Sequence, residues 1–300
     1  MLKSLLSCLF LLFVLSPVGL KAQDDTLSIV FAGDVLFDRG VRRAMVGWPD
    51  SVRLRHEGDD ALIVNLECPL TTHRSAVSKQ IVFRADTLCA DIMQHMGITH
   101  AALANNHSID HGQKGLQHTV QQLRRVGITP LGYGLDAASR MAPAVIRKGG
   151  AEVAIFNDVT FPIENWMSGG IGQRPGIANF SVDSLASAIR RYRTLHPSQH
   201  IVVFLHWGTE FKTIPTMRQR IDATKLVTAG AEAVVGQHPH VVQPMQLVGD
   251  APVFYSVGNY IFDQQQPLCR QAVTARLRFT RDGLVGYESL PVCIDNCLPK

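Results

Sequence analysis

Five short polar motifs each directly follow an apolar run rich in β-branched residues, and this repetition constrains the fold more than any other feature of the chain. Such runs predict buried strands, and segments with helical spacing separate most of them. In an open α/β sheet, ligands bind at the carboxyl ends of the strands. The motifs are Gly33-Asp34, Asn65-Leu66-Glu67, Asn105-Asn106-His107, His206-Trp207-Gly208 and Gln237-His238-Pro239-His240. The sequence therefore predicts that Asp, Glu, Asn and His side chains meet at one edge of a sheet.

The order of the expected elements is that of an α/β protein. The expected strands of the first two thirds lie near 27–32, 61–64, 99–104, 128–131, 144–147, 151–156, 201–205 and 232–235. The expected helices lie near 38–46, 87–96, 113–125, 181–194 and 216–229. The last third is predicted to be all-β, with strands over 241–248 and 252–257 and a closing hairpin over 274–290. Alternating helices and strands with a β-rich end predict a layered α/β domain.

The first 22 residues have the pattern of an export signal. Lys3 gives a basic start, an apolar segment follows over 5–15, and Ala22 suits the residue before a cleavage site. That apolar segment is too short to cross a bilayer, and no later segment is long and apolar enough. We therefore expect a signal peptide over 1–22 and a bacterial protein exported to the periplasm or the outside. By length, residues 23–300 are expected to form a single domain.

The charge balance argues against nucleic acid as a partner. The chain has a formal net charge of +4, and loss of Lys3 and Lys21 with the signal lowers it by two, to +2. The basic residues are scattered along the chain and form no stripe. Neither nucleic-acid binding nor a membrane span after signal cleavage is expected.

The motif residues form the ligand set of a metal site. Each has an ordinary alternative, since Asp34 can cap a helix and His206 can be a core histidine. His238 and His240 can be surface residues of a loop. Their joint placement favours a metal, and mixed carboxylate, amide and imidazole ligation suits Mn²⁺, Fe or Zn²⁺. Because a carboxylate such as Glu67 can bridge two ions about 3.5–4 Å apart, we expect a dinuclear divalent metal centre.

His107 is adjacent to Asn106 and cannot easily reach the same ion. It is better placed as a general acid toward a leaving group, with Asp110 orienting its ring and raising its pKa. The alternative is an Asx-type turn, in which Asn105, Asn106 and Asp110 bond to their own backbone and start the next helix. Both interpretations can hold together.

Two further charged residues are candidates for the site. Arg39, five residues after Asp34, can stabilise an anionic substrate or be a solvated helix residue. Glu210, four residues after His206, can contact a metal-ligating residue and orient it, or be an ordinary surface acid.

At these motifs the sequence resembles the bacterial capsule-synthesis family called CapA or PGA_cap, from about residue 27 to residue 291. The matching stretches are 31–34, 65–67, 83–85, 103–107 with 110–112, 206–208 with Glu210, 236–240 with Gln243, and 255–262. The family is similar in fold to the calcineurin-like metallophosphoesterases. The resemblance therefore implies a four-layer α/β sandwich, with two mixed β-sheets flanked by helices and a dinuclear site.

The resemblance also implies roles for individual residues, with two metal positions that share one carboxylate. The first position would take Asp34, Glu67 and His240. The second would take Glu67, Asn106, His206 and His238. His107 would be the proton donor. Substrate-binding candidates are other polar residues of the matching stretches, namely Asn65, Arg84, Asn105, Glu210 and Asn259.

The start of the first motif departs from the metallophosphoesterase pattern. Those enzymes usually begin with Asp-x-His, whereas Val35 and Leu36 follow Asp34 in this chain. The first metal position therefore has fewer ligands, and Arg39 is expected to replace part of the missing charge.

The family name implies poly-γ-glutamate synthesis, attachment or release at the cell surface. We therefore expect an exported metal-dependent hydrolase or transferase acting on an anionic γ-glutamyl polymer or peptide of the cell envelope, with capsule-assembly proteins as further partners. One alternative is a metallophosphoesterase acting on an exported phosphoester, against which the missing motif histidine counts. The other is a non-catalytic protein that binds or assembles the polymer, against which the intact His107 and Asp110 count.

Overall fold

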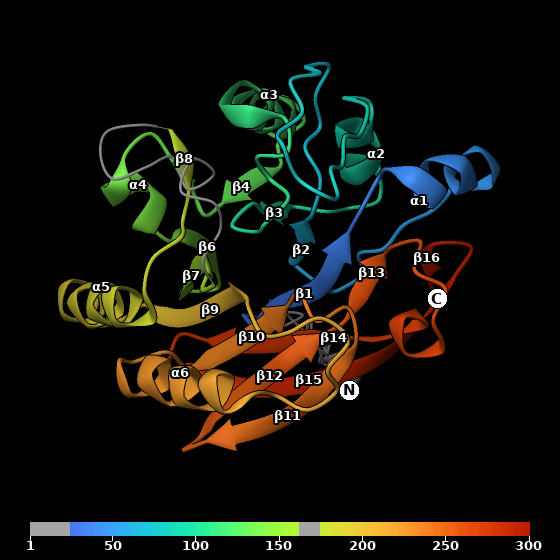
Figure 1. The fold of residues 1–300 in the computed structure, drawn as a ribbon. Coiled ribbons are helices and arrows are strands. Elements are labelled where there is room, and N and C mark those ends of the chain that lie inside the picture. The colour runs from blue at the N-terminus through green and yellow to red at the C-terminus, as the bar shows by residue number, and fades with distance from the viewer. Residues whose placement is uncertain (1–24, 162–174) are drawn as a thin grey trace, which may run out of the picture.

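Two β-sheets face each other in the computed structural model, which describes residues 25–161 and 175–300 (Figure 1). The strands of the larger sheet are, in spatial order, β16 (Leu298–Pro299), β15 (Gly283–Asp295), β14 (Gln271–Thr280), β1 (Leu27–Val35), β2 (Ala61–Leu66), β3 (His100–Ala102) and β4 (Thr129–Leu131). β13 (Asn259–Ile261) pairs with the end of β1. Since β1 to β4 are parallel and β14 and β15 are antiparallel, the sheet is mixed.

The smaller sheet is mixed as well. Its strands are, in spatial order, β11 (Val242–Val248), β12 (Ala251–Val257), β10 (Ala233–Gln237), β9 (His200–His206), β7 (Ala151–Val159) and β6 (Ala144–Lys148). The four central strands are parallel, and β11 and β6 run antiparallel at the edges. A separate pair is formed by β5 (Tyr133–Gly134) and β8 (Gly176–Ile177).

Helices cover the outer faces of both sheets. The larger sheet carries α2 (Cys89–His95) and α3 (Gly112–Arg125), and the smaller carries α5 (Val182–Leu195) and α6 (Met217–Thr228). Two short helices are α1 (Arg39–Ala44), which continues into the 3₁₀ turn η1 (Met45–Gly47), and α4 (Ala137–Met141). The predicted four-layer sandwich is therefore confirmed.

Alternation along each central strand explains the two-sided burial. In β1, Ile29 and Phe31 pack between the sheets, whereas Val30 and Ala32 pack toward the helices of the larger sheet. Successive side chains of a strand point to opposite faces, so a strand covered on both faces has apolar residues at every position. The aromatic rings of Phe31 and Phe204 meet across the sheets with centroids 5.4 Å apart.

The described helices include none that is long and apolar enough to cross a membrane. The predicted signal peptide over 1–22 lies outside the described residues.

Candidate metal centre

The polar motif residues meet where strands from both sheets end. Asp34 lies near the end of β1, Glu67 directly follows β2, and Asn106 lies in the turn after β3. His206 is the last residue of β9, and His238 directly follows β10. The expectation of one edge of a single sheet is therefore wrong, because the two histidines belong to the smaller sheet. The sheets are stacked with these carboxyl ends together, and that stacking completes the cluster.

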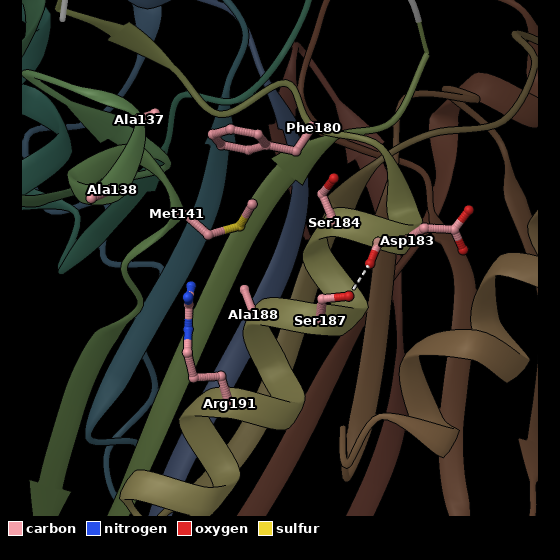
Figure 2. A pocket seen from close by; sticks show the side chains of 9 residues that line it. All are labelled: Ala137, Ala138, Met141, Phe180, Asp183, Ser184, Ser187, Ala188 and Arg191. Atoms are coloured by element: carbon pink, nitrogen blue, oxygen red, sulfur yellow. Dashed lines mark hydrogen bonds between the residues drawn. The ribbon is translucent and has the colours of Figure 1, made fainter. Parts of the chain in front are cut away.

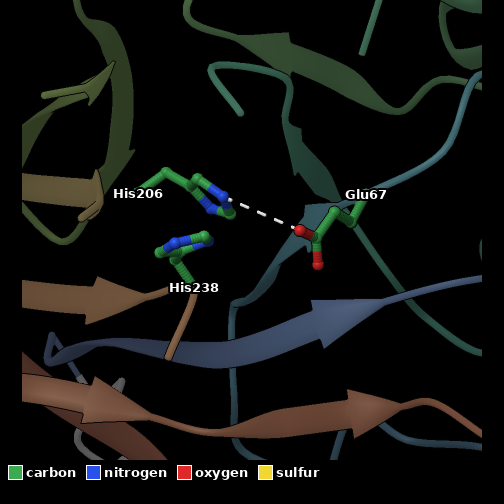
Figure 3. A group of neighbouring side chains, drawn as sticks. All are labelled: Glu67, His206 and His238. Carbon is green, nitrogen blue, oxygen red and sulfur yellow. Dashed lines mark ion pairs between the residues drawn. The ribbon is translucent and has the colours of Figure 1, made fainter. Parts of the chain in front are cut away.

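Two groups of buried side chains in this cluster can each hold a metal ion. Within each group, the potential ligand atoms all lie within 4.8 Å of one another. One group is Glu67, His206 and His238, which come from the two sheets and converge in Figure 3. The other group is Asp34, Glu67 and His240. Because Glu67 belongs to both, its carboxylate is placed to bridge two ions, as in a two-metal site.

Unsatisfied polar atoms in the cluster fit a bound cation. Among the described residues, the buried atoms Glu67 Oε2 and His238 Nδ1 have no hydrogen-bond partner. His206 Nδ1 donates to Gln237 Oε1 at 2.7 Å. Its Nε2 therefore turns a lone pair toward Asn106 Oδ1 at 2.9 Å and Glu67 Oε1 at 3.7 Å. Buried acceptors that face one another without a donor are unfavourable, and a divalent cation between them would satisfy all of them.

Burial and local charge set the protonation of the cluster. Burial lowers the pKa of His206 well below its ordinary value and that of His238 to about 3, so both imidazoles are neutral and able to bind a metal. Burial raises the pKa of Glu67 well above its ordinary value, and the nearby Asp34 raises it further. For His240, burial acts to lower the pKa, but the carboxylates of Glu67 and Asp34 outweigh it and raise the pKa to about 9.

Metal binding is expected to release protons, because two ligands must first lose one. In the metal-free protein, His240 is protonated below its pKa of about 9, and Glu67 has a raised pKa. The affinity for Mn²⁺ should therefore rise as the pH increases toward about 9 and flatten above it. Calorimetric titration in buffers of different ionisation enthalpy counts the protons released. Binding at neutral pH without proton release would contradict ligation by His240.

Three buried asparagines support the ligands. Asn65 Nδ2 donates to Asp34 Oδ1 at 2.8 Å, and Asn105 Nδ2 donates to Asn65 Oδ1 at 3.0 Å. His240 Nδ1 donates to Asn259 Oδ1 at 2.9 Å. The structure thus places Asn65, Asn105 and Asn259, which we expected to bind substrate, behind the ligands, where they fix the ligand orientation.

His107 forms a buried pair with Asp110. His107 Nδ1 donates to Asp110 Oδ2 at 2.7 Å, and the backbone N–H of Phe83 donates to the same oxygen at 2.8 Å. The Phe83 ring packs against the imidazole with centroids 4.2 Å apart. The predicted increase of the His107 pKa is wrong: burial lowers this pKa and outweighs the opposing effect of Asp110. His107 is therefore neutral near pH 7, with a lone pair on Nε2.

Lys79 also contacts this pair, although no motif in the sequence points to it. Its side chain is only 14% exposed, and Nζ donates to Asp110 Oδ1 at 2.9 Å and to the backbone oxygen of Asn106 at 2.5 Å. Nζ also lies 3.3 Å from His107 Nδ1. Lys79 comes from the irregular segment between β2 and α2, where no periodic pattern marks it. Its charge balances that of Asp110 and is a second reason why the pKa of His107 is low.

Replacement of Lys79 by methionine, which keeps the chain length but not the charge, is expected to destabilise the protein. Loss of the donor leaves Asp110 Oδ1 buried and unpaired, which costs about 1–3 kcal/mol in unfolding free energy. Urea unfolding followed by circular dichroism measures this difference. Lys114→Met on the exposed face of α3 is the matched control and should be neutral. Equal stability of the two variants would contradict a structural role for the Lys79–Asp110 pair.

Arg39 lies at the start of α1 beside the cluster. Its guanidinium lies 4.7 Å from the centre of the Phe83 ring and donates to Asp263 Oδ1 at 2.6 Å. Its side chain is 41% exposed, and its φ of 51° is a strained value for a residue with a Cβ. The Phe83 ring thus contacts both this guanidinium and the His107 imidazole.

The other two charged candidates differ in their contacts. The side chain of Arg84 donates to the backbone oxygen of Thr71 at 3.1 Å, so part of its guanidinium is used within the protein. Glu210 is exposed, but its charge contributes to the raised pKa values of Glu67 and His240, which places it near the metal ligands.

A cavity of about 660 Å³ lies between α4 and α5, away from this cluster (Figure 2). Met141 and Phe180 form its apolar side, and Ser184, Ser187 and Arg191 of α5 line the other. The cavity contains none of the predicted site residues. Neither of the two groups of potential metal ligands found in the described chain lines this cavity. We therefore assign metal binding to the buried cluster.

Comparison with known proteins identifies relatives over most of the chain. The family model described as bacterial capsule synthesis protein PGA_cap matches residues 28–264. The PGA biosynthesis protein CapA of Bacillus subtilis is 26% identical over 287 residues, a match that covers 92% of this chain and 74% of the relative. The capsule biosynthesis protein CapA of Bacillus anthracis is 25% identical over 293 residues, with 93% and 70% covered.

Solved structures similar to this one include the sulfate thiohydrolase SoxB of Thermus thermophilus. The TM-score is 0.47 at 12% sequence identity, and the match covers 80% of this chain and 38% of SoxB.

Proposed function

The chain belongs to the bacterial capsule synthesis PGA_cap family, and from this premise we propose that it is an exported, metal-dependent hydrolase or transferase acting on poly-γ-glutamate or a related γ-glutamyl substrate of the cell envelope. One observation supports the catalytic part of this proposal above all others: Glu67 is shared by two buried groups of metal ligands. The names of the two Bacillus relatives supply the substrate class.

The donor set defines two metal positions in this proposal. Asp34, Glu67 and His240 would hold one ion. Glu67, Asn106, His206 and His238 would hold the other. A divalent ion bound there polarises a carbonyl oxygen and lowers the pKa of water, which makes hydrolysis possible near neutral pH. The first position has fewer donors, because Leu36 stands where related enzymes supply a histidine, and its affinity should be the lower of the two.

The residues around the ligands would bind substrate and move the proton. His107 is neutral, and its Nδ1–H is fixed by Asp110, so Nε2 can accept a proton from the attacking group and return it to the leaving amine. Arg39, partly exposed beside Phe83, would bind a substrate carboxylate. The buried asparagines hold Asp34 and His240 in place.

Turnover by protein loaded with Mn²⁺, Fe²⁺ or Zn²⁺ tests the proposal. We expect release of free amine from a γ-glutamyl oligomer, dependent on metal and lost on chelation. Release of phenol from a nitrophenyl phosphodiester without cleavage of the oligomer would favour the phosphoesterase alternative. Binding of the oligomer without cleavage under every metal would favour the non-catalytic alternative, and either result would overturn the proposal.

A further inference from the structure

The side chain of Phe161 packs against two of the candidate metal ligands. The centre of its ring lies 4.7 Å from that of the His238 imidazole and 5.7 Å from that of His206. The two imidazoles lie next to each other, with centres 4.5 Å apart (Figure 3). The three rings are therefore in mutual contact, and one phenyl ring touches both histidines of the second metal position.

Hydrogen bonds hold the backbone at Phe161 in place. The N–H of Thr160 donates to the backbone oxygen of His206 at 3.1 Å. Asn179 Nδ2 donates to the backbone oxygens of Val159 at 2.7 Å and of Phe161 at 3.1 Å. The Phe161 side chain also packs against the core on the helix side of the larger sheet. The contact between the phenyl ring and the imidazoles is therefore supported by the fold on several sides.

His238 lacks the hydrogen bond that orients the other two histidine ligands. Nδ1 of His206 is bonded to Gln237, and Nδ1 of His240 is bonded to Asn259. Within the described chain, neither nitrogen of the His238 imidazole has such a partner, although Nδ1 is buried. Metal-binding histidines normally donate their second ring N–H to a carboxylate, carbonyl or water, which fixes the orientation of the ring. Another kind of contact must therefore orient His238.

The backbone of His238 also needs support from its surroundings. Its φ of 101° is a disfavoured value for a residue with a Cβ. Such a conformation persists only where the surrounding structure holds it in place. Aromatic rings attract each other best when they are tilted or offset with centres roughly 4.5–7 Å apart. The rings of Phe161 and His238, 4.7 Å apart with their planes tilted by 39°, meet this condition.

We propose that Phe161 is a positioning residue of the metal centre: its ring orients the His238 imidazole in place of the missing hydrogen bond, and so sets how long the second position retains a divalent ion. The inference rests on the proposed metal centre and adds a residue that is not itself a ligand, since a phenyl ring has no donor atom. An ordinary core residue at this place would need only apolar bulk, whereas this role needs a flat ring. Leucine and tyrosine at position 161 therefore separate the two interpretations.

The rate at which bound Co²⁺ is lost to a chelator tests the proposal. Phe161→Leu keeps the apolar bulk but loses the flat ring, and it should release the ion about tenfold faster or more, as expected when the support of a metal-binding histidine is removed. Phe161→Tyr keeps the ring and should release the ion at the wild-type rate. The visible absorption of bound Co²⁺ reports the ligand geometry, and it should change in Phe161→Leu but not in Phe161→Tyr. Phe161→Met, which also has no ring, is a second variant that should behave as Phe161→Leu does.

Phe180→Leu is the matched control. Phe180 is also partly buried and packs against the same core, but within the described chain its ring contacts none of the candidate ligands. This variant should release Co²⁺ and absorb light as the wild type does, and circular dichroism verifies that every variant is folded.

The outcomes separate this inference from the proposed metal centre. Equal release rates in Phe161→Leu and Phe180→Leu, with unchanged absorption, would overturn the positioning role and leave the metal centre in place. Release from Phe161→Tyr as fast as from Phe161→Leu would also overturn it, because the ring alone should suffice. A wild-type protein that binds no Co²⁺, Mn²⁺ or Zn²⁺ would overturn the metal centre and this inference together.

Discussion

Replacement of His238 by alanine is expected to remove divalent metal from the purified protein and to abolish any turnover that depends on it. His238 converges with Glu67 and His206, its Nδ1 has no hydrogen-bond partner within the described chain, and burial keeps it neutral. Changes to residues that only support ligands already cost about 10–100-fold in metal affinity, so loss of a ligand should cost more. Elemental analysis of protein purified without chelator measures the metal content.

A matched control separates the loss of a ligand from the loss of a buried histidine. His200 is also buried, pairs with Glu232 at 2.9 Å, and packs on Phe279, all outside the cluster. His200→Ala should lower stability and keep the metal. If His238→Ala retained the metal content of the wild type, the cluster would not be the metal centre. The buried Glu67 Oε2, which has no hydrogen-bond partner in the described chain, would then need another explanation.

The long elements of the fold could be predicted because their apolar residues repeat with a clear period. In β1, apolar residues occupy the central positions on both faces, and α3 places Leu116, Val120 and Leu123 on one face. Short elements lack enough residues for such a pattern. The five-residue helix α4 depends on a capping box between Asp136 and Ser139, and β13 forms only because it pairs with the end of β1.

Gly33 shows why the pairing of β1 with β13 could not be predicted from the sequence. A Cβ on Gly33 would lie 1.8 Å from the backbone oxygen of Gly258, so glycine is required where β1 and the start of β13 approach each other. The sequence marks Gly33 only as the neighbour of Asp34. The contact joins residues far apart in the chain, and only the folded structure brings them together.

The ligands of the candidate centre could be predicted, but their environment could not. Asp34, Glu67 and His206 stand out because each lies at the end of an apolar run. The charge state of His107 depends on its burial and on Lys79, which arrives from a segment without any pattern. The sequence shows only the neighbouring Asp110, which by itself predicts a raised pKa for His107, whereas burial and Lys79 lower it.

Replacement of His107 by alanine is expected to lower turnover by about 10²–10⁴-fold, the usual contribution of general acid–base catalysis. The metal content should stay that of the wild type, because His107 belongs to neither group of ligands. Since burial lowers the pKa of His107 from 6.5, the neutral, active form should persist into mild acid. With metal kept saturating at each pH, turnover should then fall only at a pH below this ordinary value, and in His107→Ala that acid limb should disappear.

His111→Ala is the control for this variant, because His111 is a buried histidine of the same segment that forms no pair with Asp110 in the described structure. It should keep both metal and turnover. A loss of metal in His107→Ala would mean that His107 supports the ligand loop through Asn106, and its catalytic assignment would fail. Unchanged turnover with full metal content would place the proton transfer on another group, and the pairing of His107 with Asp110 would then be structural.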